Sequence, residues 1–427
     1  MQETYSTSAF HTVSQLAGLT AVHRAFQWFH LQEPKLREWH RQVASIPAPP
    51  FGEQARAQWM VEQFTALGLE NVHIDACGNA LGSIYGAHSH SNSPSVDGAS
   101  PFRPCTLLSA HLDTVFPADA IGIPVEEGSR LLGPGVSDNC AGIVALLATA
   151  AAMQSAGVQP ATDILFAGNV GEEGEGNLRG MRYLFTESPA AARIRSVIVL
   201  DGAGTDSIVI QALGSKRFNV VITGPGGHSW IDARIPNPIL VLSNALAALG
   251  KIKLPGSPRT TWNVGHIEGG TAINAIPQSA QARIDTRSTD ASMLLSLERE
   301  IFHAVEQAIC EANSSLGPAS ANEQKSPALR FQIETIGERP AATLDDDAGI
   351  LLALRAIDRH LGIHSQPRIA STDANIPLSL GIEAVSIGSG GRGGGVHTRQ
   401  EWFDAAGRDL ALRRILLLLL ALAQAEI

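Results

Sequence analysis

The sequence predicts an α/β fold in which a mainly parallel sheet is interrupted by a smaller α+β domain. In the first half of the chain, short β-rich runs alternate with longer helical runs, which is typical of a parallel sheet covered by helices. From about Lys216 the strands alternate apolar and polar residues more regularly, and the helix–strand alternation returns after Gly337. We therefore expect one domain formed by 1–215 and 338–427, with 216–337 inserted into it.

Each expected element rests on a local pattern of side chains. The helix at 53–67, for example, repeats apolar residues such as Met60 and Phe64 at helical spacing. The other expected elements of the large domain are strands at 106–110, 163–168, 196–200 and 384–387, helices at 139–154 and 346–360, and a closing helix. Those of the inserted domain are strands at 217–223, 281–287 and 329–335 and helices at 238–249 and 292–310.

The composition describes a globular protein with an acidic balance. Of the 427 residues, 44% are hydrophobic and 17% are charged, so the chain has ample apolar side chain for a core and is not disordered throughout. The net charge is -10 and Lys and Arg form no run, which argues against a nucleic-acid partner. The four cysteines show no CxxC spacing (Cys77, Cys105, Cys140 and Cys310), so we expect neither a disulfide framework nor a thiolate zinc site. Free cysteines are typical of a reducing compartment, so we expect a cytoplasmic location.

We expect neither a secretion signal nor a membrane-spanning segment in this sequence. The first residues lack a basic start followed by an apolar core, so we expect no secretory signal. The apolar run at 415–423 is too short to span a bilayer and is expected to be a buried helix. We therefore expect that the protein does not bind a membrane. By composition, 86–104 and 313–327 are expected to be surface loops.

Two predicted strands end beside residues that are common metal ligands. The strand at 106–110 runs into His111, with Asp113 two residues later, and the strand at 196–200 leads to Asp201. Ligands bind at such strand ends, and a carboxylate like that of Asp113 orients a metal-bound histidine. Taken alone, His111 fits a hydrogen-bonded structural histidine at least as well.

Two further segments supply carboxylates. Asp138 stands directly before the helix at 139–154, where the local pattern favours a helix cap, although this position also directs a carboxylate out of the sheet edge. The strand at 163–168 continues into a glycine-rich segment with Glu172 and Glu173, which offers one carboxylate for a metal and one for proton transfer. Solvated loop charges are the alternative interpretation of this pair.

A glycine-rich bend precedes His397 near the end of the chain. It has neither the spacing of a phosphate-binding loop nor a helix directly after it. A backbone that passes close to a ligand explains these glycines better, and we assign Gly391 to substrate binding.

These residues together predict a metal site. Two histidines and three carboxylates, at four strand ends and one helix start, would meet at one sheet edge. They suit two divalent ions, with zinc as the first expectation and cobalt or manganese as the others, and a carboxylate shared between them. Such ions, about 3.5–4 Å apart, activate a water and polarise a scissile carbonyl. The expected ligands are His111, Asp138, Glu173, Asp201 and His397.

Other hydrolytic schemes have less support. The sequence contains neither an HExxH zinc motif nor a GxSxG nucleophile elbow. Cys140 is better interpreted as a small buried helix residue than as a nucleophile.

The motifs HLDT, SDN, GEEGEG, LD, GPGGHS and GGVHT, in this order, resemble those of the M20 family of metallopeptidases and amidohydrolases. The resemblance runs from about Arg41 to the C-terminus, and it is closest to the tripeptidase-like (peptidase T-like) branch. It implies a zinc-hydrolase catalytic domain with an inserted ferredoxin-like lid, which in many relatives also forms a homodimer contact. The sequence departs from the pattern at 86–104, an insertion that puts substrate size in doubt.

The resemblance also implies roles in the large domain. Asp138 would bridge the ions, His111 and Asp201 would complete one site, and Glu173 and His397 the other. Glu172 would be the general base and later the proton donor to the leaving amine, with Asp113 as the partner of His111.

In the inserted domain, the resemblance implies three contacts with the substrate. His228 would stabilise the oxyanion, sometimes from the partner subunit, Asn274 would bind near the reacting carbonyl, and Arg287 would bind a substrate carboxylate. The alternatives are a polar turn residue for His228 and, for Arg287, an exposed ion-pair ladder with Arg283 and Asp285.

The expected function is hydrolysis of a short peptide, including removal of an N-terminal residue, by a two-metal site. The second hypothesis is deacylation of an N-acyl or N-carbamoyl amino acid, or a carboxypeptidase reaction, at the same site. The third is a non-catalytic binding protein with the same fold.

Overall fold

The computed structural model describes residues 2–87, 103–314, 316 and 328–423. The chain divides into two compact units: unit 1 comprises Met1–Ala212 and Thr343–Ile427, and unit 2 is Leu213–Ala342. The sequence predicts these boundaries after 215 and after 337. Most of the two expected surface loops, at 86–104 and 313–327, lies outside the described residues.

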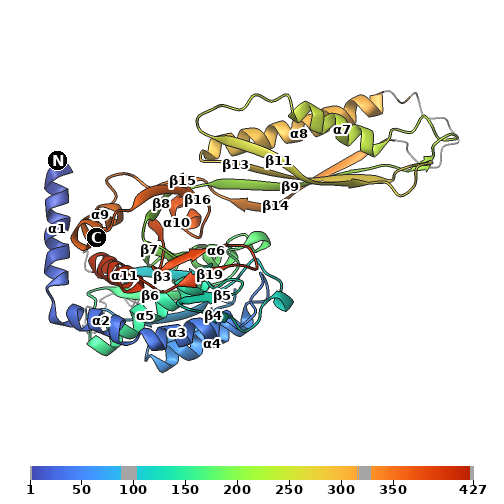
Figure 1. Ribbon diagram of the computed structural model, residues 1–427. Helices are drawn as coiled ribbons and strands as arrows, with labels where there is room; N and C mark the ends of the chain where they lie inside the picture. Colours follow the sequence, from blue (N-terminus) through green and yellow to red (C-terminus); the bar gives the residue numbers. More distant parts are fainter. Residues whose placement is uncertain (1, 88–102, 315, 317–327, 424–427) are drawn as a thin grey trace, which may run out of the picture. The chain divides into compact units, whose positions relative to one another are not determined.

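A nine-stranded sheet forms the centre of unit 1 (Figure 1). Its strands are β1 (Glu70–Ile74), β2 (Ala80–Ile84), β3 (Cys105–His111), β6 (Asp163–Asn169), β7 (Ile194–Leu200), β8 (Ser207–Ala212), β15 (Ala342–Thr343), β16 (Gln366–Ala370) and β17 (Glu383–Ile387). The order is β1-β2-β6-β3-β7-β17-β8-β15, with β16 paired to β8. β3 is parallel to β6 and β7, and β17 to β7, whereas β2 is antiparallel to β1 and β6. The predicted mainly parallel α/β class is therefore confirmed.

The central strands are buried along their length, as expected in a parallel sheet. The helices of unit 1 are α1 (Gln2–Ala17), α2 (Thr20–Leu31), α3 (Glu33–Ala44), α4 (Gln54–Ala66), α5 (Cys140–Ala156), α6 (Arg179–Thr186), α9 (Gly349–Leu361), α10 (Asn375–Ser379) and α11 (Arg408–Ala423). α5 packs on β3, and α2 and α3 pack on α5, so the Ala- and Leu-rich α5 is buried almost all round. The elements expected from the sequence do not include α1, α2 and α3.

The apolar run at 415–423 lies within α11, the closing helix of the chain. Ile415 and the five leucines after it are at most 1% exposed, as predicted for a buried helix. Among the helices of the described residues, none has the length and apolar character needed to cross a bilayer.

A second, four-stranded sheet in unit 1 supports the segment that carries His397. Its strands are β4 (Val125–Glu127), β5 (Arg130–Leu132), β18 (Arg392–Gly394) and β19 (Trp402–Asp404), in the order β18-β19-β5-β4. Strands β18 and β19 are antiparallel and flank His397, so their pairing holds the ends of that segment together.

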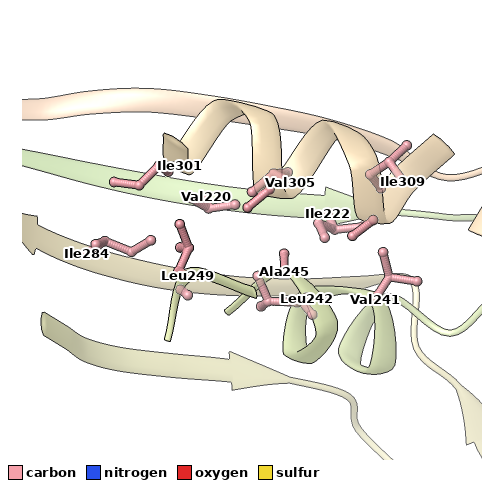
Figure 2. Close-up of a cluster of buried hydrophobic side chains, with 14 of the residues drawn as sticks. Val220, Ile222, Val241, Leu242, Ala245, Leu249, Ile284, Ile301, Val305 and Ile309 are labelled. Carbon is pink, nitrogen blue, oxygen red and sulfur yellow. The ribbon is translucent and has the colours of Figure 1, made fainter. Parts of the chain in front are cut away.

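Unit 2 has the ferredoxin-like βαββαβ topology expected of the inserted domain. Its main elements are β9 (Gly214–Thr223), α7 (Pro238–Leu249), β11 (Thr260–Gly269), β13 (Ser279–Ser288), α8 (Ala291–Ser314) and β14 (Arg330–Arg339). The sheet order is β11-β13-β9-β14, and every pair is antiparallel. Figure 2 shows the core, in which Val220 and Ile222 of β9 face apolar residues of both helices, such as Leu242 and Val305.

Candidate metal centre

The carboxyl ends of the central strands bring the predicted ligands of unit 1 to one edge of the sheet. In the parallel register, His111 at the end of β3 lies opposite Asn169 at the end of β6, shortly before Glu173 in the chain. On the other side, Leu200 at the end of β7 precedes Asp201 and lies opposite Ile387 of β17. This edge is where open α/β sheets bind ligands.

Two groups of side chains at this edge have the geometry of a metal site. Within each group the ligand atoms lie within 4.8 Å of one another, and the groups are His111, Asp138 and Asp201, and Asp138, Glu173 and His397. The Nε2 atom of His111 lies 3.1 Å from Oδ1 of Asp138 and 3.8 Å from Oδ1 of Asp201. All five predicted ligands therefore lie together.

Asp138 belongs to both groups and presents a different oxygen to each. Its Oδ2 atom lies 3.2 Å from Nε2 of His397, which in turn lies 3.0 Å from Oε1 of Glu173. Imidazole nitrogens and carboxylate oxygens are donors that zinc, cobalt and manganese accept. The residues present therefore fit a pair of divalent ions with Asp138 between them.

The charges of this cluster shift the pKa values of its members. For Asp138, burial opposes ionisation, but hydrogen bonds with His111 and His397 hold its pKa well below the usual value. Burial, together with the charge of Asp138, raises the pKa of Glu173 to about 7. The hydrogen bond to Asp138 raises the pKa of His397 to about 9. The cluster thus favours positive charge beside Asp138, which bound metal ions would supply.

Asp113 is buried behind the metal-binding groups. Its carboxylate accepts hydrogen bonds from the backbone N–H groups of Glu172 (2.9 Å) and Glu173 (2.7 Å), and its Oδ1 lies 3.6 Å from Nδ1 of His111. Burial works against its ionisation, yet these partners keep its pKa below the usual value. Asp113 therefore connects the ring of His111 to the segment that carries the two glutamates.

The capping role that the local pattern favours for Asp138 is wrong, because Asn139 is the N-cap of α5. The Asn139 side chain accepts a hydrogen bond from the Gly142 N–H (3.1 Å) and donates one to the Leu200 carbonyl (2.8 Å). With the helix capped by its neighbour, the Asp138 carboxylate points instead to the two histidines.

Sequence reasoning missed Glu401, which holds the segment that carries Asp138. Its fully buried carboxylate accepts hydrogen bonds from the backbone N–H groups of Gly135 (2.9 Å), Ser137 (2.7 Å) and Asp138 (2.8 Å). The available signal was its position four residues after His397 in a recognised motif.

Asp373, also missed, is fully buried and accepts a hydrogen bond from the Asn169 side chain (2.6 Å). Burial raises the pKa of Asp373 to about 6. An acidic residue in the STDAN motif was the only hint in the sequence.

The glycine-rich bend has a structural cause that the sequence does not reveal. A Cβ atom at Gly391, where φ is +67°, would lie 2.5 Å from the Asp404 carbonyl oxygen of β19, so the close neighbour is protein backbone. Gly391 also lines a cavity of about 720 Å³ whose lining includes Asp138 and Asp201 of the candidate metal groups. Its role in substrate binding stays a prediction.

The other predicted residues are distributed between the units. Glu172 is buried beside Glu173 in unit 1, and Cys140 is a fully buried helix residue whose thiol pKa is raised to about 11 by burial. In unit 2, His228 on β10 (Gly227–His228) lies close to Asn274, because the Ser229 N–H donates to the Asn274 carbonyl (3.1 Å).

Arg287 lies apart from His228 and Asn274 within unit 2. It is near the far end of β13, eight residues from Ser279, or about 27 Å along an extended strand. Its Nε donates to Oδ2 of Asp285 (2.8 Å), and Asp285 also pairs with Arg217 (3.2 Å). This is the exposed ion-pair arrangement that competes with a substrate role.

Comparisons with known proteins agree with this geometry. A family model described as "Peptidase family M20/M25/M40" matches residues 107–423. A probable carboxypeptidase from Emericella nidulans is 27% identical over 58% of this chain and 61% of its own length. The chain thus matches about three fifths of the length of such curated relatives.

Two solved structures share the fold. A tripeptidase from Staphylococcus aureus aligns with a TM-score of 0.70 at 20% identity, over 92% of this chain and 98% of that one. The YXEP protein of Bacillus subtilis, described as a dinuclear metal-binding peptidase of the M20 family, aligns with a TM-score of 0.63 at 13% identity, over 91% of this chain and 98% of that one. At these identities the likeness concerns the fold alone.

Proposed function

Since the chain belongs to peptidase family M20/M25/M40, we propose that it is a two-metal hydrolase that cleaves an amide bond in a short peptide. The observation that carries the proposal is the place of Asp138 in two candidate metal groups, with one carboxylate oxygen turned to His111 and the other to His397. A relative described as a dinuclear metal-binding peptidase gives further support.

In this proposal, His111 and Asp201 would hold one ion, Glu173 and His397 would hold the other, and Asp138 would contribute to both sites. When bound, the ions, with zinc the first expectation and cobalt or manganese the others, acidify a water and polarise the scissile carbonyl. The His111 Nδ1–H donates to the backbone carbonyl of Asp113 (3.1 Å), which fixes the ring of His111, and Glu401 fixes the backbone of Asp138.

Glu172 moves the proton in this scheme. Its carboxylate takes the proton of the attacking water and delivers it to the leaving nitrogen as the C–N bond breaks, which yields a carboxylate and a free amine. Its side chain is only 6% exposed and its backbone N–H is held by Asp113, so the carboxylate starts from a fixed backbone. His228 and Asn274 of unit 2 are proposed to contact the reacting carbonyl, and Arg287 and Gly391 other parts of the substrate.

The oligomeric state and the cellular location are also proposals. A homodimer through unit 2 is testable by light scattering of the purified chain. A cytoplasmic location fits the four cysteines, which are all free thiols in the structure.

The proposal is tested with Glu172→Gln and a substrate panel. We expect the variant to keep its metal content while turnover falls by about 100- to 10,000-fold, because general acid–base catalysis is lost. The panel contains free tripeptides, free dipeptides and N-blocked amino acids, each with and without a chelator. Exposed Glu175, in the same glycine-rich segment, supplies the matched control Glu175→Gln.

Each outcome of the panel has a distinct meaning. Loss of turnover in chelator supports a metal-dependent reaction, whereas turnover of blocked amino acids alone replaces peptidase activity with deacylation. Undiminished turnover in Glu172→Gln would remove Glu172 from the mechanism. A chain that binds metal and turns over no substrate would be a binding protein with this fold.

A further inference from the structure

A second, much smaller cavity of unit 1 lies behind β19. Trp402 of this strand lines the cavity at the candidate metal groups, whereas its neighbour Phe403 lines the second cavity, because consecutive residues of a strand point to opposite faces. The second cavity has a volume of about 20 Å³, which is room for one water molecule or one monatomic ion. Arg37, Arg130 and Arg408 line it, and we call it the arginine cavity.

Positive charge dominates the wall of the arginine cavity. Among the described residues of the lining, Glu126 is the only acidic one. It balances little of the charge of the arginines, because its carboxylate lies 4.0 Å from Nη1 of Arg37 and both side chains are about half exposed. His40, also in the lining, adds no charge near neutral pH, since burial and the charge of Arg408 lower its pKa to about 3.

Arg408 is buried, and one of its donors lacks a partner. Its side chain is 1% exposed, and its Nε and Nη2 atoms donate to the carboxylate of Glu33. Its Nη1 atom is also buried and has no hydrogen-bond partner among the described residues. Leaving a buried donor of a charged group unpaired costs free energy, so a small acceptor in the arginine cavity would be stabilising.

The arginines of the cavity also repel one another. Burial lowers the pKa of Arg408, and the charge of Arg37 lowers it further, against the effect of the pair with Glu33. Arg130 stacks over the Trp402 ring at 4.1 Å, a contact that uses the face of its guanidinium and leaves the N–H groups at the edge. A water molecule would satisfy one donor, whereas an anion would also reduce this repulsion.

A larger hollow beside the arginine cavity has the opposite character. It has a volume of about 310 Å³ and shares Arg37 with the arginine cavity, but its lining includes Glu33, Asp404 and Asp409. These carboxylates disfavour an anion in the hollow. An anion is therefore favoured in the arginine cavity, whose volume admits a monatomic ion but not a carboxylate or phosphate ligand.

The arginine cavity adjoins the contacts that hold Asp138 in place. The His40 Nε2–H donates to the carbonyl of Val136 (2.6 Å), two residues before Asp138. The His40 ring packs against Phe403, with the ring centroids 4.6 Å apart. Phe403 follows Glu401 by two residues, and the Glu401 carboxylate accepts from the Asp138 N–H. An ion that fixes the wall of this cavity therefore also restricts the segment of Asp138.

We propose that the arginine cavity binds one monatomic anion, such as chloride, and that the bound ion stabilises the segment that carries Asp138. The ion accepts a hydrogen bond from Nη1 of Arg408 and reduces the repulsion between Arg408, Arg37 and Arg130. This site is separate from the candidate metal groups, and it makes their supporting segment sensitive to the anion in solution.

Bromide locates the ion directly, because it replaces chloride and scatters anomalously. In crystals of the wild type grown in sodium bromide, we expect an anomalous peak within hydrogen-bond distance of Nη1 of Arg408. The absence of a peak at this atom would mean that the cavity holds water, and would overturn the site.

Thermal unfolding in chelator measures the same binding in solution. Sodium chloride is compared with sodium gluconate at constant ionic strength, because gluconate is too large for the cavity. We expect Tm to rise by about 1–3 °C for each tenfold increase of chloride above its Kd. Arg37→Gln should reduce this gain without breaking the pair of Arg408 with Glu33. The matched control is Arg355→Gln, since Arg355 is 48% exposed like Arg37 but lies outside the lining.

Hydrogen exchange of the metal-free protein tests the effect on Asp138. Peptides that cover 135–138 should exchange more slowly in chloride than in gluconate, by up to about tenfold for each tenfold increase of chloride above its Kd, because opening of the segment releases the ion. Peptides of unit 2 are the control and should exchange equally in both salts.

The outcomes separate the two parts of the inference. An equal gain in Tm in Arg37→Gln and the wild type would contradict the site. A bromide peak at Arg408 with unchanged exchange at 135–138 would keep the ion and remove its effect on Asp138. Because metal is absent from both solution measurements, their results do not depend on whether the chain hydrolyses a peptide.

Discussion

Units 1 and 2 have interiors of different chemistry. The core of unit 2 is a continuous apolar cluster between one face of its sheet and two helices (Figure 2). The interior of unit 1 contains a large apolar core as well, but ionisable groups such as His111, Asp113, Asp373 and Glu401 are at most 1% exposed. Burying such groups costs free energy unless they are paired, so their concentration at one sheet edge marks unit 1 as the site of chemistry.

The largest effect is expected from Asp138→Asn, which keeps the shape of the side chain and removes its charge. Because Asp138 belongs to both candidate metal groups, the content of divalent metal should fall well below the two ions per chain that we propose, and turnover should fall to background. Metal analysis of the purified variants measures this directly. Asp206→Asn is the control for metal content, since Asp206 lines the same cavity but belongs to neither group. A normal metal content in Asp138→Asn would contradict the proposed role of Asp138 as a shared ligand.

Phe218→Ala should destabilise unit 2 without affecting the metal groups of unit 1. Phe218 is fully buried in the apolar cluster, and removing a buried phenyl ring lowers the free energy of unfolding by about 3–5 kcal/mol. Hydrogen exchange should show faster exchange in peptides of unit 2 only. The matched control Phe331→Ala removes a ring that is 36% exposed on β14 and should cost much less. A parallel loss of bound metal in Phe218→Ala would show that the two interiors are not independent.

Whether an element of unit 2 can be predicted from the sequence depends on how many of its side chains are buried. α7 runs from Pro238 to Leu249 as predicted, because its buried face repeats at helical spacing and Asn237 caps it. Strand β11 is not predicted, because most of its side chains are exposed and the alternation of Trp262 and Val264 with polar residues ends after Val264. Its place in the sheet depends on pairing with β13, which is a long-range interaction.

In the candidate metal site, the ligands at strand ends can be predicted from the sequence, but the residues that hold these ligands in place cannot. His111 and Asp201 are predictable because each follows an apolar strand whose end must lie at the ligand-binding edge. Asp138 and Asn139 are both good capping residues, and only the fold decides that Asn139 takes the cap. Glu401 accepts from backbone groups more than 260 residues away in the chain, a relation that no local pattern contains.

The smallest expected effect concerns His40, a buried histidine of unit 1. Replacing it tests whether a buried polar group of unit 1 makes the free energy of unfolding depend on pH. Its Nε2–H donates to the Val136 carbonyl (2.6 Å), and burial, together with the charge of Arg408, lowers its pKa to about 3. Between pH 6.5 and 3 the unfolded chain therefore binds a proton that the folded chain does not, so stability falls as pH decreases. From pH 7 to pH 5 this loss should be about 2 kcal/mol in the free energy of unfolding. His40→Gln keeps a donor for the Val136 carbonyl and cannot titrate. Urea unfolding in the presence of a chelator should therefore show that the variant loses about 2 kcal/mol less free energy of unfolding between pH 7 and pH 5 than the wild type. Equal losses in wild type and variant would mean that His40 takes up its proton in the folded state.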